Sequence, residues 1–255
     1  MRLMNFVVAS EYEDLRAWLM QMPRLFDDNQ GELLYRGRNQ IRLFDVDGRK
    51  LVVKRFKRND IIKAVVYTLF RKNKARRSYE NAGLLRQRGF VTPYEVAYIE
   101  QRTAGLVTQV YYVCAYTDAQ PIRPRLIEQE PVDERLATDY ARYVASLHEA
   151  GVLHRDLNPT NVLFSENGEP AAVSFELIDI NRMQFFDGAV PKAACMENLT
   201  LFYWLTPAYH FILNEYAKQR GWNDVDIAEA IHVKERHDKR WICRKQITHL
   251  GKYKH

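Results

Sequence analysis

The chain has 255 residues, of which 47% are hydrophobic and 27% charged, a composition typical of a globular protein whose core needs no disulfide or metal staples. Its three cysteines, Cys114, Cys195 and Cys243, form no CxxC pair, which excludes zinc-ribbon and thioredoxin-like sites and favours reduced thiols in a cytosolic protein. The net charge of +6 fits nucleic acid, phosphorylated substrates or anionic membranes as partners and selects none of them.

The amino-terminal residues, MRLMNFVVASEYEDL, contain no long apolar run before acidic residues intervene, so we expect no secretory signal. No segment approaches the roughly 18 consecutive apolar residues that a membrane-spanning helix needs. The expected location is therefore cytoplasmic, with at most peripheral contact with a membrane.

The first half of the chain is predicted to be rich in β-strands. Residues 31–57 read as strands joined by turns, and Asp47-Gly48 is a strong hairpin signal between two of them. Residues 60–88 have helical character and end before Gly89 and Pro93. Residues 94–116 return to strand character, so this half combines a sheet with one embedded helical region.

The second half is predicted to be mainly helical. A connector at residues 117–131 leads to a helix at 132–150, whose apolar residues recur every three or four positions. Three short β-like pieces follow, with a turn at Asn167-Gly168 between the second and third, and helical character resumes from Met196 to about His232. We therefore predict an α+β, two-lobed fold: a β-rich N-lobe at 1–116 and a mainly helical C-lobe at 117–255, with a ligand cleft between them.

The strongest chemical signal is HRDLNPTN at residues 154–161, which has the form H-R-D-L-x-x-x-N of the catalytic loop in protein-kinase-like folds. It follows a predicted helix and precedes a short strand, which is the context that the motif requires. Phosphoryl transfer needs a carboxylate to accept the proton of the attacking hydroxyl, and Asp156 supplies one. It also needs a hard oxygen ligand for Mg²⁺, and Asn161 supplies one five residues later.

Three further residues follow the order of a kinase site. Asp179, at the end of a β-like run, is the expected main Mg²⁺ ligand, and Lys54, on a predicted strand, is expected to bind the α- and β-phosphates of ATP. Glu80, in the helical region after Lys54, is expected to form an ion pair that positions the lysine. Each residue alone is more often a solvated or capping side chain, but the ordered combination with HRDLNPTN is hard to obtain by chance.

Residues 61–77 combine an apolar helix face with a basic cluster. The apolar residues repeat every four positions, and Arg71, Lys72, Lys74, Arg76 and Arg77 follow them. We expect the apolar face to pack in the core. For the basic cluster, a solvated turn and a contact with anionic lipid or a phosphorylated saccharide both remain open. The basic tail reads as solvated, and nucleic acid is not an expected partner.

These motifs, with LVVKRF, NKARRSYENAGLL, GFVTP and ELIDINR, make residues of roughly 30–215 resemble the lipopolysaccharide kinase (Kdo/WaaP) family of the protein-kinase-like superfamily. The resemblance implies an ATP- and Mg²⁺-dependent kinase. Its acceptor would be a sugar hydroxyl of the lipopolysaccharide inner core, Kdo or heptose, at the inner face of the inner membrane. Asp156, Lys54 and Glu80 would be the catalytic residues. ATP would be held by Gly37, Lys54, Asn161 and Asp179, the last two through Mg²⁺.

The chain departs from ordinary protein kinases at several positions. The nucleotide-covering loop contains one glycine, Gly37, and Arg38 or Asn39 would have to compensate for the missing ones. Position 158 is asparagine where serine/threonine kinases carry lysine, the D-F-G triplet is replaced by DIN at 179–181, and no A-P-E motif follows. These departures favour a carbohydrate or lipid-linked acceptor over a protein. An atypical protein kinase, a small-molecule phosphotransferase and a non-catalytic ATP-binding scaffold remain alternatives.

Overall fold

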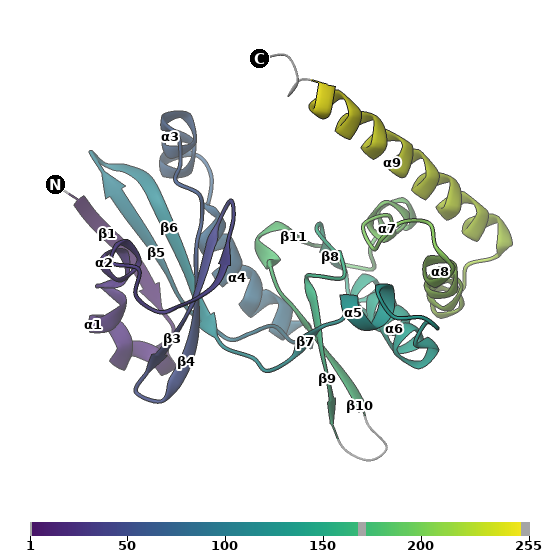
Figure 1. Ribbon diagram of the computed structural model, residues 1–255, viewed down its shortest axis with the longest axis horizontal. Coiled ribbons are helices and arrows are strands. Elements are labelled where there is room, and N and C mark those ends of the chain that lie inside the picture. The colour runs from purple at the N-terminus through teal and green to yellow at the C-terminus, as the bar shows by residue number, and fades with distance from the viewer. Residues whose placement is uncertain (1, 168–171, 251–255) are drawn as a thin grey trace. The chain divides into compact units, whose positions relative to one another are not determined.

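The computed structural model describes residues 2–167 and 172–250 of the chain (Figure 1). The chain forms two compact units. Unit 1 comprises the residues up to Asp118 together with Asp179–Arg182, and unit 2 comprises Ala119–Ile178 and the chain from Met183 onward. The short segment Asp179–Arg182 therefore clusters with unit 1 although it lies far along the sequence.

Unit 1 is built on a six-stranded antiparallel sheet with the strand order β1-β5-β6-β4-β3-β2. The strands are β1 (Arg2–Val8), β2 (Glu32–Arg36), β3 (Gln40–Val46), β4 (Arg49–Arg55), β5 (Glu95–Thr103) and β6 (Leu106–Ala115). The predicted hairpin is confirmed, because Val46 of β3 pairs with Arg49 of β4 across Asp47-Gly48. Both turn residues have positive φ, 52° and 77°, as a tight two-residue turn requires.

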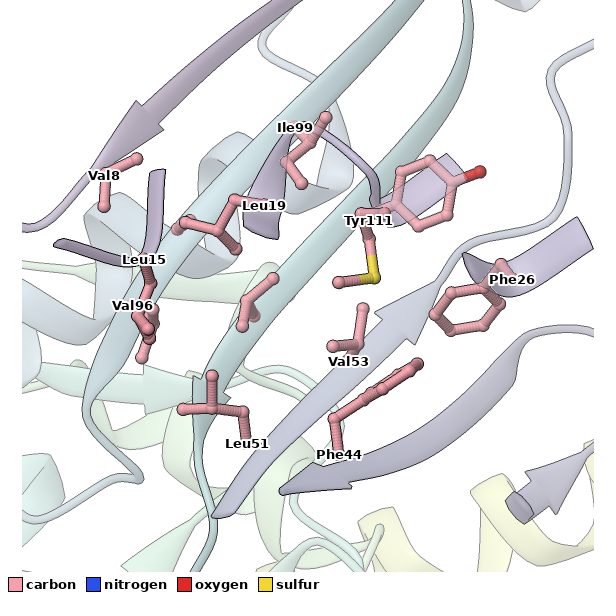
Figure 2. Packing of buried hydrophobic residues seen from close by; sticks show 13 residues of the cluster. Val8, Leu15, Leu19, Phe26, Phe44, Leu51, Val53, Val96, Ile99 and Tyr111 are labelled. Carbon is pink, nitrogen blue, oxygen red and sulfur yellow. The ribbon is translucent and has the colours of Figure 1, made fainter. Parts of the chain in front are cut away.

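One face of this sheet carries the core of unit 1. The short helices η1 (Ser10–Leu15), α1 (Arg16–Leu19) and α2 (Met22–Asp27) cover it. Figure 2 shows Leu51 and Val53 of β4 among Leu19, Phe26 and other members of the cluster. Because successive strand residues point to opposite faces, the burial of Leu51 and Val53 directs Lys54 to the other side of the sheet.

The second face of the sheet carries α3 (Ile61–Leu69) and α4 (Lys74–Gln87). A smaller apolar cluster fills this side. The start of α4 is fixed by Asn73, whose side chain accepts from the Arg76 backbone N–H (3.1 Å) and donates to the buried Glu100 carboxylate (2.6 Å). The 3₁₀ turn η2 (Ile180–Arg182) is held to α4 by Asn81, which donates to the Ile180 carbonyl oxygen at 2.7 Å.

The expectation that the apolar face of residues 61–70 packs in the core is wrong. Ala64 is buried, and Tyr67 and Thr68 lie partly buried beside it, whereas Ile61, Ile62, Leu69 and Phe70 are exposed. The physical reason is that a small residue and a polar one, Ala64 and Thr68, fit against β6.

Unit 2 is mainly helical. Its helices are α5 (Arg123–Ile127), α6 (Glu134–Glu149), α7 (Lys192–Leu199), α8 (Pro207–Arg220) and α9 (Asp224–Leu250). Its strands form two small sheets: β7 (Gln120–Pro121) with β9 (Val162–Asn167) and β10 (Ala172–Leu177), and β8 (Val152–His154) with β11 (Met183–Phe185).

The predicted helix at 132–150 is confirmed as α6, which begins where the Asp133 side chain accepts from the Leu136 backbone N–H at 3.0 Å. The predicted turn at Asn167-Gly168 lies partly outside the described residues. The later helical region is longer than predicted, since it begins at Lys192 and α9 continues to Leu250. Across residues 2–167 and 172–250, none of the helices has the length and apolar character needed to cross a bilayer.

Candidate active site

The HRDLNPTN loop of unit 2 begins at His154, the last residue of β8, and hydrogen bonds of the His154 side chain hold the loop in place. The buried His154 ring accepts from the backbone N–H of Asp156 at Nδ1 (3.1 Å), and its Nε2 lies 2.9 Å from the carbonyl oxygen of Ile178. Because a carbonyl only accepts, Nε2 must carry the proton and Nδ1 must be the acceptor. His154 is therefore a neutral brace for the loop, and both of its ring nitrogens are occupied.

The Asp156 carboxylate is held by neutral groups. Asn158 donates to its Oδ1 at 3.3 Å, and the side chain of Asn161 donates to its backbone carbonyl oxygen at 2.8 Å. Among the residues that the structure describes, no cation pairs with Asp156. An acceptor-only carboxylate without a counter-charge, held in a fixed backbone geometry, is well suited to accept a proton.

Asn161 is tied on two sides. Its amide nitrogen is bound to the Asp156 carbonyl oxygen, and its own backbone carbonyl accepts from the Ile178 N–H at 3.0 Å. With the nitrogen so engaged, the side-chain oxygen is the atom left to face a cation. This orientation fits the predicted role of Asn161 as a hard oxygen ligand for Mg²⁺.

A buried chain of hydrogen bonds supports this loop from three helices. Asn198 of α7 donates to the His154 carbonyl oxygen (2.9 Å), and its own side-chain oxygen lies 3.1 Å from His148 of α6. The other ring nitrogen of His148 lies 2.8 Å from the Tyr216 hydroxyl of α8. Burial lowers the pKa of His148 to about 4, so the imidazole is neutral near pH 7. These residues were not predicted from the sequence. The one available signal was the position of His148, which lies on the apolar face of α6, four residues after Val144.

In unit 1, the structure brings Lys54 and Asp179 together. The Lys54 ammonium lies 2.8 Å from the Asp179 carboxylate, and the Asn181 side chain donates to the same oxygen at 2.5 Å. Asp179 has a φ of 55°, in the left-handed region that non-glycine residues seldom adopt. Such strained residues gather at functional sites, which supports a ligand-binding role for Asp179.

Positive charge is concentrated around this pair. Lys54 and Lys74 lie over the same buried Phe56 ring, with their ammonium groups 5.3 and 5.9 Å from its centre. Burial lowers the pKa of Lys74, and the neighbouring guanidinium groups of Arg38, Arg182 and Arg77 lower it further. Cations that repel one another around a single carboxylate are arranged to receive a polyanion. The sequence placed Lys74 only in the basic cluster and gave no sign of Arg182, because their proximity to Lys54 and Asp179 depends on the fold.

Gly37 lies at the turn between β2 and β3, where its N–H donates to the Asn39 carbonyl oxygen at 3.0 Å. A side chain at this position would meet the Tyr35 ring, which is exposed and would have to move aside. A polar hollow of about 370 Å³ opens beside Gly37 and Arg38. Neither Lys54 nor Asp179 lines this hollow, so the hollow does not contain the Lys54–Asp179 ion pair.

The predicted ion pair between Lys54 and Glu80 is not formed in this structure. Glu80 instead accepts from Lys72 (2.8 Å) and Arg76 (2.9 Å), and Lys54 pairs with Asp179. Arg76 lies one turn before Glu80 on the same helix, a spacing that favours such pairs. Partial burial alone would raise the pKa of the Glu80 carboxyl. The hydrogen bonds and charges of Lys72 and Arg76 together outweigh that effect and lower the pKa below its ordinary value.

Ribosomal protein S6 kinase alpha-2 of Mus musculus is 31% identical over 121 residues, which cover 45% of this chain and 15% of that protein. The KEOPS complex subunit Bud32 of Pyrococcus abyssi is 30% identical over 114 residues, 43% of this chain and 50% of that protein. The chain therefore spans half or less of these curated relatives.

A solved structure described as WaaP in complex with acyl carrier protein has a TM-score of 0.62 to this chain and 22% identity. The match covers 92% of this chain and 98% of that one, and it confirms the predicted two-lobed, protein-kinase-like α+β fold. The model of the lipopolysaccharide kinase (Kdo/WaaP) family matches residues 16–200. The resemblance inferred from the motifs is thus confirmed, and the chain belongs to the lipopolysaccharide kinase (Kdo/WaaP) family.

Proposed function

We propose that this chain is an ATP-dependent kinase that transfers the γ-phosphate to a sugar hydroxyl of the lipopolysaccharide inner core, Kdo or heptose. The observation that carries the proposal is the Asp156 carboxylate. It lies in an HRDLNPTN loop, has no cationic partner among the described residues, and accepts a neutral hydrogen bond from Asn158, while Asn161 donates to the backbone carbonyl oxygen of the same residue. Membership of a lipopolysaccharide kinase family supports the sugar acceptor.

Asp156 acts as the general base. The acceptor hydroxyl oxygen forms a bond to the γ-phosphorus, the bond from that phosphorus to the bridging oxygen of ADP breaks, and the hydroxyl proton passes to the Asp156 carboxylate. Because the transition state of phosphoryl transfer is loose, positioning and electrostatic stabilisation supply most of the acceleration. The neutral hydrogen bonds to Asp156 are consistent with this role, since Asn158 orients the carboxylate without neutralising its charge and Asn161 holds the backbone that carries it.

The nucleotide phosphates are bound by cations of unit 1. Lys54 contacts the phosphates, and we add Lys74 and Arg38 to the predicted set because their charges lie near each other, Lys74 lies near Asp179, and neither cation forms an ion pair within the part of the chain that the structure describes. The turn at Gly37 covers the nucleotide. Glu80 retains at most an indirect role, through Lys72 and Arg76.

Mg²⁺ fits the oxygen donors that the chain offers. The Asp179 carboxylate and the Asn161 amide oxygen are the hard ligands that this cation prefers. When bound, the ion neutralises charge on the β- and γ-phosphates. The Lys54–Asp179 pair satisfies the two charges in the absence of nucleotide, so Mg–ATP would give each of them a new partner of opposite charge.

The acceptor class is tested by transfer of labelled phosphate from Mg–ATP to a panel of acceptors. The panel contains underphosphorylated lipopolysaccharide core, free Kdo and heptose, aminoglycosides and a generic protein substrate. Label on the core that is lost with Asp156→Asn is the expected result. Label on an aminoglycoside or protein alone would keep the mechanism and overturn the acceptor, and nucleotide binding with no transfer would favour a scaffold. An inner-core acceptor would place the enzyme at the cytoplasmic face of the inner membrane, as a peripheral protein.

A further inference from the structure

Helix α3 presents an unusual surface, because its apolar side chains point away from the protein. Ile61, Ile62, Leu69 and Phe70 are 79, 78, 66 and 80% exposed. With Val66, which is also exposed, they form a continuous stripe along the helix. Exposed large apolar residues are ordinary when scattered singly, whereas a contiguous patch on one element indicates a contact surface.

Hydrogen bonds hold α3 in this orientation. The side chain of Asp60 caps the helix by accepting from the Lys63 N–H at 2.8 Å. On the inner face, the Thr68 hydroxyl accepts from the Val107 N–H of β6 at 2.9 Å, and just before the helix the Asn59 side chain donates to the Val107 carbonyl oxygen at 3.0 Å. These polar bonds seat the small inner face, Ala64 and Thr68, against the sheet. Rotation of the helix to bury the apolar stripe would break them.

The surroundings of α3 are strongly basic. Residues 57–77 contain eight lysines and arginines and a single acidic residue, Asp60, so this segment carries more positive charge than the net +6 of the whole chain. Lys57 and Arg58 are exposed before the helix, and Arg71 and Lys72 are exposed after it. Cations therefore flank both ends of the apolar stripe, and the one acidic residue is already paired with Lys63.

We propose that α3 is a membrane-docking element that inserts its apolar stripe into the headgroup region of an anionic bilayer. Apolar residues on one face with lysine and arginine beside them are the features of helices that lie in a membrane interface. A charged bilayer surface would meet the cations at both ends of the stripe at once. The proposal rests on α3 and its neighbours, and it would bring the proposed kinase to an acceptor anchored in the membrane.

Flotation of the full chain with lipid vesicles tests the proposal. One set of vesicles is phosphatidylcholine alone, and the other contains phosphatidylglycerol as well. We expect binding to the anionic vesicles that weakens with salt, and a loss of roughly tenfold or more in the triple variant Ile61→Gln, Leu69→Gln, Phe70→Gln. The matched control is Met20→Gln, Val225→Gln, Ile242→Gln, which removes three exposed apolar residues outside α3 and should bind as the wild type does.

An environment-sensitive dye gives a second measurement. Attached through Phe70→Cys in a Cys243→Ser background, the dye should shift to the blue on anionic vesicles, whereas a dye attached through Val225→Cys should not. Unchanged flotation of the α3 variant, or no binding of the wild type to anionic vesicles, would overturn the proposal. Capture of an acidic protein or formation of a dimer through the same residues, without vesicle binding, would overturn it too.

The docking surface and the proposed reaction are separable. The α3 variant should retain phosphate transfer to a soluble core saccharide, because none of its three substituted residues belongs to the candidate active site. A wild-type chain that floats with anionic vesicles but transfers no phosphate to the core saccharide would count against the proposed function and leave the docking surface intact. The reverse result would count against the docking surface alone.

Discussion

The candidate site residues of the two units are held by different forces. Those of unit 1 form an electrostatic arrangement, in which Lys54 and Lys74 gather around the Asp179 carboxylate. Those of unit 2 form an arrangement of neutral hydrogen bonds, in which His154 accepts from the Asp156 backbone N–H and Asn161 donates to the Asp156 carbonyl oxygen. The arrangement in unit 1 suits the binding of a polyphosphate and a metal ion. The arrangement in unit 2 suits a base that must remain charged and well oriented.

The comparison distinguishes charged side chains, which would bind the ligand, from neutral hydrogen bonds, which orient a reacting group. Substitutions in unit 1 should alter nucleotide and metal affinity and their dependence on salt. Substitutions in the bracing network of unit 2 should alter the stability and geometry of the loop, with less effect on nucleotide affinity.

The largest effect is expected at Asp179. Removal of its charge by Asp179→Asn should reduce kcat/KM by about 10³-fold or more, because the variant loses both the proposed Mg²⁺ ligand and the counter-charge of Lys54. The Mg²⁺ concentration needed for half-maximal activity should rise. Steady-state kinetics over a range of Mg²⁺ concentrations measures both. A variant whose Mg²⁺ dependence matches the wild type would show that Asp179 does not hold the metal.

His148 tests the neutral network of unit 2. Its folded pKa of about 4 lies below the ordinary 6.5, so the unfolded chain takes up a proton first as pH falls. The contribution of neutral His148 to the free energy of unfolding is therefore fully present above about pH 6.5 and is lost as the pH falls toward 4. Between pH 7.5 and pH 5, the free energy of unfolding should fall by about 2 kcal/mol. Urea unfolding of the wild type and of His148→Gln at both pH values gives the difference. If the free energy of unfolding depended on pH equally in the two proteins, His148 would not be the buried neutral group that the structure indicates.

Lys74 tests the electrostatic arrangement in unit 1, and its substitution should have a smaller effect. Lys74→Met should weaken Mg–ATP binding by roughly tenfold, because the proposed charge-assisted contact to phosphate is lost while an unbranched side chain of similar length is kept. The turnover of bound nucleotide should change less. Calorimetric titration with Mg–ATP at two salt concentrations measures the affinity. The control is Lys218→Met, which removes an exposed lysine of α8 and should bind Mg–ATP normally.

The smallest effect is expected at Glu80. Since Glu80 pairs with Lys72 and Arg76 and not with Lys54, Glu80→Gln should reduce kcat/KM only a few-fold, the size expected for partly exposed ion pairs. Steady-state kinetics decides the matter. A loss comparable to that of Asp179→Asn would mean that Glu80 supports Lys54 during turnover, as the kinase pattern predicts.

Features that neighbouring residues determine were predictable from the sequence. The hairpin at Asp47-Gly48 and helix α6 were predictable because a local turn and a local periodicity determine them. The HRDLNPTN motif was recognisable because its residues are adjacent in the chain. The role of each predicted site residue stays a prediction.

Features that depend on distant segments were not accessible from the sequence. The pairing of Lys54 with Asp179, in place of Glu80, follows from the way η2 clusters with unit 1. The exposure of the α3 stripe was missed for the same reason, since amphipathicity shows that a helix has an apolar face and not which way that face points.

The most direct test of the central claim is a single-turnover measurement of phosphate transfer with Asp156→Asn. The substitution keeps the shape of the side chain and removes its capacity to accept a proton. We predict that Mg–ATP binds to the variant with nearly unchanged affinity and that the rate of transfer to the core saccharide falls by about 10²–10⁴-fold. Transfer at the wild-type rate with bound nucleotide would contradict the assignment of Asp156 as the base.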